Sequence, residues 1–311
     1  MARYLPVLFA APFLLALTGC EFEDMASAVN EKEEFHITKP LKAGGHFRIE
    51  NYNGSVEISG WERDEVDIAG TKYASTRSQL AEIRIDVQSG GDIVQIRTVP
   101  PVERRGNSGA KYVIRVPHRV LLDQVNSSNG SIRIERVEGA AHVRTSNGGV
   151  RTRSLTGSLD VTTSNGTIEV SDLKGGALLA TSNGSIKADN IRGMFQARTS
   201  NGSIDARLFD VPAGSPVKAS TTNGRVELTL DVIKTDIRAS TSNGSIQVNL
   251  PSNVNARIDA NTSNSRIFSD FDVKAGTSSK RRLEGVLGAG GPTIELNTNN
   301  GEIRVRKGVT I

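Results

Sequence analysis

The chain has 311 residues, a formal net charge of +4 and only 5% aromatic residues. The scarcity of aromatic side chains and the lack of a recognised nucleic-acid-binding motif argue against a nucleic-acid partner. Cys20 is the only cysteine, which excludes a disulfide within one copy of the chain, so packing and hydrogen bonds must supply the stability.

The first 19 residues have the pattern of a bacterial export signal. Arg3 precedes a mostly apolar run from Leu5 to Leu17, and small residues lead to Cys20. This order resembles the lipobox of bacterial lipoproteins, which implies cleavage before Cys20 and a lipid anchor on that cysteine. Glu21 in place of an aspartate favours the outer membrane in this resemblance. An ordinary secretory signal with a coincidental cysteine is the alternative.

Two segments precede the regular part of the chain. Residues 20–34 are predicted to be an acidic, solvated tether, because Glu21 to Glu34 contains six acidic residues and one lysine. Residues 35–125 contain irregular runs of alternating apolar and polar residues, which are typical of strands. We predict that they form a β-rich N-terminal cap and the first coils of a repeat.

Residues 126–271 repeat the sequence Thr-Ser-Asn-Gly or a close variant. The first five asparagines are spaced by 18 residues, and the next three follow at intervals of 22, 20 and 21. Apolar residues lie six and four positions before each asparagine and three and five after it, which predicts two short strands per unit. A further apolar residue lies eight positions after the asparagine, in the series Val137, Leu155, Leu173, Ile191 and Phe209.

Two architectures fit this pattern. Asn-Gly between alternating strands is a strong hairpin signal and would give an antiparallel meander or barrel. The constant period instead favours an all-β parallel β-solenoid, or β-helix, with coils of about 18 to 22 residues that stack on one another. In such a stack, equivalent asparagines and the threonines two residues before them would form hydrogen-bonded ladders. The predicted structural ladder contains Asn129, Asn147, Asn165, Asn183, Asn201, Asn223, Asn243, Asn264 and Asn300.

The side chains four residues after each asparagine are mostly charged, and the order of their signs partly supports stacked coils. The series reads Arg133, Arg151, Glu169, Lys187, Asp205, Glu227 and Gln247. Stacked coils would bring neighbours to about 5 Å, so three successive contacts from Arg151 to Asp205 would join opposite charges. The contacts from Arg133 to Arg151 and from Asp205 to Glu227 would join like charges.

The C-terminal part interrupts the rhythm and then resumes it. Residues 272–292 are predicted to be a loop insertion, because they contain Lys280-Arg281-Arg282 and a glycine-rich stretch. Residues 293–311 are predicted to form the last coil and the C-terminus, since Asn300-Gly301 restores the repeat.

Several short segments resemble the DUF4097 family, which is named for its adhesin-like repeats. They are Asn-Gly-Ser-Val-Glu-Ile-Ser-Gly-Trp at 53–61, Val116-Pro117, and Leu287 to Gly291 followed by Asn300 to Ile303. The similarity covers about residues 35–307. It implies a β-repeat fold and brings no catalytic residues to this chain.

The sequence predicts no metal site, cofactor or catalytic residue. Its histidines, His36, His46, His118 and His142, lack cysteine or carboxylate partners at metal-binding spacing, so we expect ordinary surface or cap residues. Parallel β-helices do host polysaccharide lyases and hydrolases. For that alternative, the carboxylates to consider are Asp259, Asp270 and Asp272, and Asp205 with Glu227.

The favoured function is therefore a non-enzymatic lipoprotein of the bacterial cell envelope. Its repeat domain would present a regular polar surface for weak multivalent binding of a glycan, an envelope polymer or a protein. An envelope structural or stress-associated scaffold without a specific ligand is the first alternative. A polysaccharide lyase or hydrolase is the second.

Overall fold

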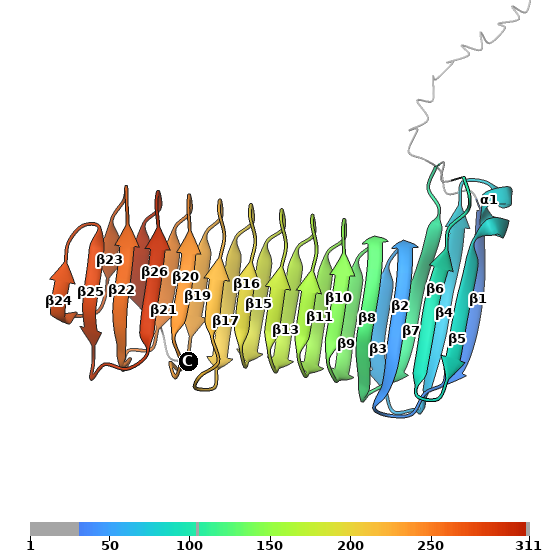
Figure 1. Cartoon of the computed structure of the whole chain (residues 1–311), viewed down its shortest axis with the longest axis horizontal. Coiled ribbons are helices and arrows are strands. Elements are labelled where there is room, and N and C mark those ends of the chain that lie inside the picture. The colour runs from blue at the N-terminus through green and yellow to red at the C-terminus, as the bar shows by residue number, and fades with distance from the viewer. Residues whose placement is uncertain (1–30, 104–105, 309–311) are drawn as a thin grey trace, which may run out of the picture.

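The computed structural model describes residues 31–103 and 106–308. These residues form two long sheets that lie face to face and run along the longest axis of the molecule (Figure 1). Sheet A has 13 strands and sheet B has 14. The short helix α1 (Arg77–Glu82) lies in the N-terminal region, and the hydroxyl of Thr76 accepts a hydrogen bond from the Gln79 backbone N–H at its start. No helix in the described part of the chain has the length and apolarity of a membrane span.

Within each sheet, every strand is hydrogen-bonded to the strands that lie beside it. In spatial order, sheet A contains β1 (Glu31–Pro40), β4 (Glu65–Ala74), β7 (Gly109–Pro117), β3 (Val56–Trp61), β9 (Ile132–Glu138), β11 (Val150–Thr156), β13 (Ile168–Lys174), β15 (Ile186–Arg192), β17 (Ile204–Asp210), β19 (Val226–Leu230), β21 (Ile246–Leu250), β27 (Ile303–Lys307) and β23 (Ile267–Ser269). In spatial order, sheet B contains β24 (Lys274–Ser278), β25 (Arg282–Leu287), β22 (Ala256–Thr262), β26 (Thr293–Thr298), β20 (Ile237–Thr241), β18 (Val217–Ser220), β16 (Phe195–Arg198), β14 (Ala177–Ala180), β12 (Leu159–Thr162), β10 (Ala141–Thr145), β8 (Val120–Asn129), β2 (Gly45–Asn53), β6 (Ile93–Val99) and β5 (Arg84–Gly90).

The repeat region is a parallel β-solenoid, as the constant period predicts. Each regular coil has one strand in sheet B and one in sheet A, joined at the Asn-Gly corner. Neighbouring coils pair in parallel with a shift of one repeat, so that Val150 lies opposite Ile168 and Leu159 lies opposite Ala177. The antiparallel meander is wrong for this region because the two strands that flank each Asn-Gly corner lie in different sheets.

The core fills the space between the sheets, and a backbone irregularity extends it to the second corner. In β13, Ile168 and Val170 are buried, and the next buried residue is Leu173, three positions later. Asp172 has a φ of +56°. This left-handed residue inserts one extra position, so two successive side chains point outward before Leu173 turns inward. Equivalent residues with positive φ occur in three other coils: Arg136, Ser154 and Asn190.

Phe209 differs in burial from the other members of the apolar series that lies eight residues after each asparagine. Strand β17 has no residue with positive φ, so its alternation continues and buries Leu208, while Phe209 is 42% exposed. The guanidinium carbon of Arg192 lies 4.2 Å from the centre of the Phe209 ring. Phe209 therefore lies at the surface, whereas the equivalent residues Val137, Leu155, Leu173 and Ile191 are buried.

At the N-terminal end, antiparallel strands close the stack. Strand β1 pairs with β4, which pairs with β7, and β5 pairs with β6 on the other sheet. Strand β1 begins at Glu31, so residues 31–34 belong to the folded part and not to the tether predicted over 20–34. Cys20, the predicted signal peptide and the rest of that tether lie outside the described residues.

At the C-terminal end, the chain departs from the predicted organisation in two ways. Residues 272–292 contain the antiparallel pair β24 and β25, in place of the predicted loop. The coil of β26 and β27 does not lie at the end of the stack. Strand β26 inserts between β20 and β22, and β27 inserts between β21 and β23. The outermost coil is thus β22 and β23, which the antiparallel strand β25 covers on sheet B.

Candidate functional site

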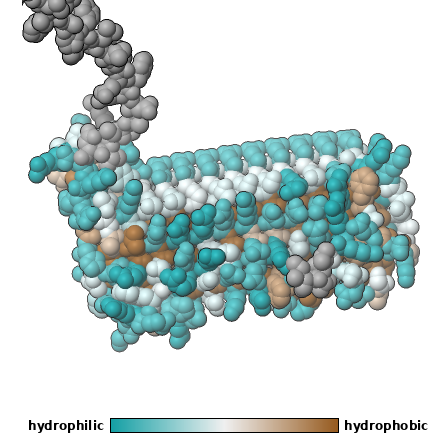
Figure 2. All heavy atoms as spheres, turned by 180° about the vertical axis from the view of Figure 1, so that it is seen from behind, coloured by the Kyte–Doolittle hydropathy of each residue, from teal (hydrophilic) through white to brown (hydrophobic). Residues whose placement is uncertain are grey.

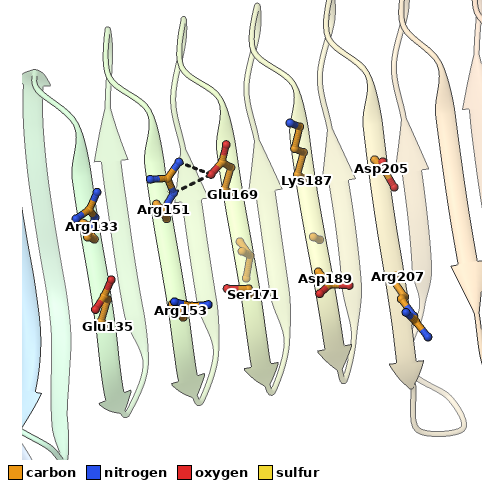
Figure 3. A pocket seen from close by; sticks show the side chains of 12 residues that line it. Arg133, Glu135, Arg151, Arg153, Glu169, Ser171, Lys187, Asp189, Asp205 and Arg207 are labelled. Atoms are coloured by element: carbon orange, nitrogen blue, oxygen red, sulfur yellow. Dashed lines mark hydrogen bonds and ion pairs between the residues drawn. The ribbon is translucent and has the colours of Figure 1, made fainter.

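The outward side of sheet A carries a shallow depression of about 690 Å³ across β9, β11, β13, β15 and β17 (Figure 3). Two rows of side chains line it, one on each side of the inward-facing residue of each strand. We call these ten residues the charged face. The first row is Arg133, Arg151, Glu169, Lys187 and Asp205, and the second is Glu135, Arg153, Ser171, Asp189 and Arg207.

The first row is the charge series predicted from the repeat. Backbone register places each of its members opposite the next. Arg151 and Glu169 form an ion pair, with 2.6 Å between the Arg151 Nη2 and Glu169 Oε2 atoms. No ion pair joins Glu169 to Lys187 or Lys187 to Asp205 in the described structure, although they are neighbours in register. One of the three predicted opposite-charge contacts is therefore an ion pair.

The two like-charge contacts predicted from the repeat are neighbours in register in the structure. Arg133 lies opposite Arg151, and Asp205 lies opposite Glu227 of β19. Burial raises the pKa of Asp205, and the charge of Glu227 raises it further. The nearby charges of Arg225 and Lys187 oppose this shift but do not cancel it.

In the second row, the ion pairs are long or missing. Glu135 lies 3.6 Å from Arg136, and Arg207 lies 3.9 Å from Asp231. Arg153 and Asp189, like Arg133 and Lys187 of the first row, form no ion pair among residues 31–103 and 106–308. The charged face thus carries cations and anions that no ion pair within the described residues neutralises.

The asparagines of the predicted ladder all lie together in one continuous column. From Asn147 onward, each amide nitrogen donates to the amide oxygen of the asparagine one coil earlier in the stack, at 2.7–2.8 Å. The order in space is Asn129, Asn147, Asn165, Asn183, Asn201, Asn223, Asn243, Asn300 and Asn264. A regular row of hydrophilic residues along one long edge of the molecule is visible in Figure 2. Within the column, each amide between the two ends donates one N–H and accepts one bond, so the column ties successive coils together.

The threonines two residues before these asparagines form a second column, but they do not bond to one another. Each buried hydroxyl donates to the carbonyl oxygen of a glycine in the preceding coil, as Thr199 does to Gly184 at 2.9 Å. The other donors are Thr145, Thr163, Thr181, Thr221, Thr241, Thr262 and Thr298. A side chain at the glycine column would block this contact, since a Cβ on Gly184 would lie 1.8 Å from the Gly166 carbonyl oxygen.

The histidines have carboxylate partners that sequence spacing does not reveal. Each partner comes from a different strand, between 18 and 77 residues away. The pairs are His36 with Asp67, His46 with Asp123 at 3.0 Å, His118 with Glu138 at 3.4 Å, and His142 with Asp160 at 3.8 Å. Within the described part of the chain, no group of three or more His, Cys, Asp or Glu side chains could hold a metal ion.

Asp67 is the most buried of these carboxylates, with 8% of its side chain exposed. Burial favours its neutral form, but hydrogen bonds from His36 and Arg115 outweigh burial and lower its pKa. The Arg115 Nη2 atom lies 2.7 Å from the Asp67 Oδ2 atom. This cluster joins β1, β4 and β7, so it stabilises the N-terminal cap.

The carboxylates considered for catalysis are only partly brought together. Asp259 lies on β22 of sheet B, opposite Glu295 and Glu284, whereas Asp270 follows β23 and bonds through its backbone to β27 of sheet A. Asp259 is therefore in a different sheet from Asp270. Asp205 and Glu227 are cross-strand neighbours on sheet A.

Comparison with protein families gives one result for this chain. Residues 176–306 match the family model Toastrack DUF4097. The predicted DUF4097 resemblance is confirmed over this segment, which covers β14 to β27. No curated protein matches the chain.

Three solved structures are similar to the chain. A candidate cell adhesion protein from Clostridium sporogenes has 12% identity and a TM-score of 0.27, with 89% of this chain and 100% of that chain covered. A candidate adhesin from Bacteroides fragilis has 12% identity and a TM-score of 0.39, with 88% of this chain and 97% of that chain covered. A candidate adhesin from Parabacteroides merdae has 11% identity and a TM-score of 0.42, also with 88% and 97% covered.

Proposed function

We propose that the chain is a lipid-anchored protein of the bacterial cell envelope and that its adhesin-like Toastrack domain binds a ligand through the charged face without catalysing a reaction. The observation that supports this is the charged face itself. Five of its charged side chains form no ion pair within the described residues, and the strand spacing holds them at regular intervals: Arg133, Arg153, Lys187, Asp189 and Asp205. An open array of this kind suits many weak contacts with an extended polymer or with another protein surface.

A second function is favoured by one observation. Asp205 and Glu227 lie side by side, and the pKa of Asp205 is raised, as is needed for a general acid beside an ionised carboxylate. Both residues lie on the outer surface of a sheet, and Glu227 pairs with Arg225 at 3.1 Å. Release of reducing ends from a charged polysaccharide, abolished by Asp205→Asn, would support a hydrolase in place of an adhesin.

The experiment that tests binding is a glycan array probed with the purified full chain. We expect a dose-dependent signal that decreases with salt, because the contacts are charged and exposed. Arg133→Ala/Arg153→Ala removes two unpaired cations from the charged face and should weaken the signal. Arg144→Ala/Arg198→Ala is the matched control, since it makes the same change in charge on the outward side of sheet B, where these residues also lack ion pairs in the described structure.

Two results would contradict the binding proposal. Silence across charged and neutral glycans, envelope polymers and envelope proteins would favour the scaffold without a specific ligand. Equal weakening by both double variants would show that net charge, and not the charged face, determines binding.

The anchor is tested separately, since Cys20 lies outside the described residues. We expect metabolic labelling with a fatty acid to mark the wild-type chain in a bacterial host and to leave Cys20→Ser unlabelled. Labelling of both proteins, or of neither, would contradict a lipid on Cys20.

A further inference from the structure

The two rows of the charged face carry opposite signs on three of its five strands. Strand β9 presents Arg133 and Glu135, β15 presents Lys187 and Asp189, and β17 presents Asp205 and Arg207 (Figure 3). Residues two apart on a strand point to the same side, about 6 to 7 Å from each other. On each of these strands, a positive and a negative side chain therefore stand next to each other on the same surface.

A surface with this pattern is complementary to itself. Consider a two-fold axis that runs parallel to the long axis of the solenoid, between two copies whose charged faces meet. The rotation places the first row of one copy over the second row of the other copy, strand by strand. Arg133 then faces Glu135, Lys187 faces Asp189 and Asp205 faces Arg207, and symmetry makes each contact twice.

The remaining two strands do not undo this match. On β13, Glu169 faces the uncharged Ser171. On β11, Arg151 faces Arg153, which is a like-charge contact. The cost of that contact is reduced because Glu169 already neutralises Arg151 within its own copy at 2.6 Å.

A two-fold axis along the strands is less favourable. It makes as many opposite-charge contacts, namely Arg133 with Asp205, Glu135 with Arg207 and Arg153 with Asp189. It also brings Arg151 against Lys187 and Glu169 against Glu169 of the second copy, so it has one more like-charge contact than the other axis. It would also point the two solenoids in opposite directions. The axis parallel to the solenoid keeps both N-terminal ends on the same side, so both chains can leave one membrane through their tethers.

We propose that one partner of the charged face is a second copy of this chain, in a parallel, face-to-face dimer. This inference rests on the proposed function, because it names one ligand of the same face. Exposed ion pairs are individually weak and the face is shallow, so the association is weak in solution. It becomes significant where lipid anchors concentrate the copies on one membrane.

The test measures self-association of the purified full chain by sedimentation equilibrium in detergent. We expect the average mass to rise with protein concentration and to fall between about 0.05 and about 0.5 M sodium chloride, as the Debye length shortens from more than about 10 Å to less than about 8 Å. Arg133→Glu should lower the association constant by about fivefold or more, because two opposite-charge contacts become like-charge contacts.

A charge exchange separates the proposed geometry from other arrangements. Arg133→Glu/Glu135→Arg keeps opposite charges in contact only if β9 faces β9 of the second copy, so it should restore the wild-type constant to within about twofold. If β9 faced β17, the exchange would be at least as damaging as the single change. Arg144→Glu on sheet B is the matched control and should leave the constant unchanged.

A chain that stays monomeric at every concentration, or an exchange variant that associates no better than Arg133→Glu, would overturn the inference. Thermal unfolding of each variant shows whether the fold is intact. The glycan array, repeated on the same samples, keeps the two proposals apart: a monomeric chain that still binds a glycan refutes the dimer and leaves the proposed function standing.

Discussion

Removal of one amide from the middle of the asparagine ladder should destabilise the coils on both sides of it. Asn183→Ala deletes two hydrogen bonds of 2.7 Å, one donated to Asn165 and one accepted from Asn201. A net contribution of about 0.5 to 1.5 kcal/mol per bond would give about 1 to 3 kcal/mol. The ladder is exposed to water, so we expect about 1 to 2 kcal/mol.

The assay is urea unfolding followed by circular dichroism, with Ser182→Ala as the control. Ser182 is the exposed neighbour of Asn183, and it contributes only backbone hydrogen bonds to the adjacent coils. Hydrogen exchange should also show faster opening of the backbone N–H groups of Asn183 and Asn201, which bond to Ser164 and Ser182. The reasoning fails if Asn183→Ala and Ser182→Ala lower the unfolding free energy equally.

Three further changes test other parts of the stack. Thr152 is buried with a hydroxyl that has no partner in the described structure, so Thr152→Val should raise the unfolding free energy by about 1 kcal/mol. Thr199→Val removes a bond of 2.9 Å to the Gly184 carbonyl and one of 3.2 Å from the Gly202 N–H, so it should lower the unfolding free energy by about 1 to 3 kcal/mol. Parallel urea unfolding curves check both changes. Gly184→Ala places a carbon 1.8 Å from a backbone oxygen and should cost about 3 kcal/mol or more, whereas Gly90→Ala, with nothing within 4 Å of the new carbon, should be tolerated in the same assay. The hydrogen bonds that lower the pKa of Asp67 stabilise the folded chain at neutral pH, and that stability is lost as the pH falls below about 4. The Asp67→Asn variant should therefore have a lower unfolding free energy at neutral pH, and its unfolding free energy should change less than that of the wild type in an acid titration.

The parallel stack could be predicted because one polar residue recurs at a fixed interval. Identical amides at a spacing of 18 residues can hydrogen-bond to one another only if the copies are neighbours in space. The bonds from Asn147 to Asn129 and from Asn165 to Asn147 are of this kind. The charge series followed from the same period, which is why Arg151 and Glu169 could be expected to meet.

Features that depend on other parts of the chain could not be predicted in this way. The repeat places Phe209 in the same apolar series as Leu173 and Ile191, but the inward turn at that position requires a left-handed residue, which β17 lacks. The partner of His46 is Asp123, 77 residues away, and no periodicity links the two. The self-complementary signs of the charged face also needed the structure, since they appear only when the second row is known to point outward beside the first.

The order of the coils is the largest departure from the sequence-based prediction, and both ends of the stack depart in a related way. Coil β2–β3 lies between coil β6–β7, which follows it in the chain, and coil β8–β9. Coil β26–β27 lies between β20–β21 and β22–β23. A simple one-dimensional stack is weakest at its ends, because a terminal coil has a neighbour on one side only and exposes unpaired strand edges.

Because a later coil inserts between two earlier ones, and antiparallel strands pair with the outer strands, the terminal coils gain neighbours and fewer strand edges stay unpaired. The outermost C-terminal coil, β22–β23, cannot leave without losing its pairing with β26 and β27, and the antiparallel strand β25 covers its other side in sheet B. At the opposite end, β4 and then β1 extend sheet A beyond β7, and β5 closes sheet B beyond β6. Because fraying from either end must break these long-range pairings together, the strands of the charged face between them are held in fixed register. Opposite charges in contact across a two-fold axis require that register, since a slip of one residue would turn both rows away from the surface.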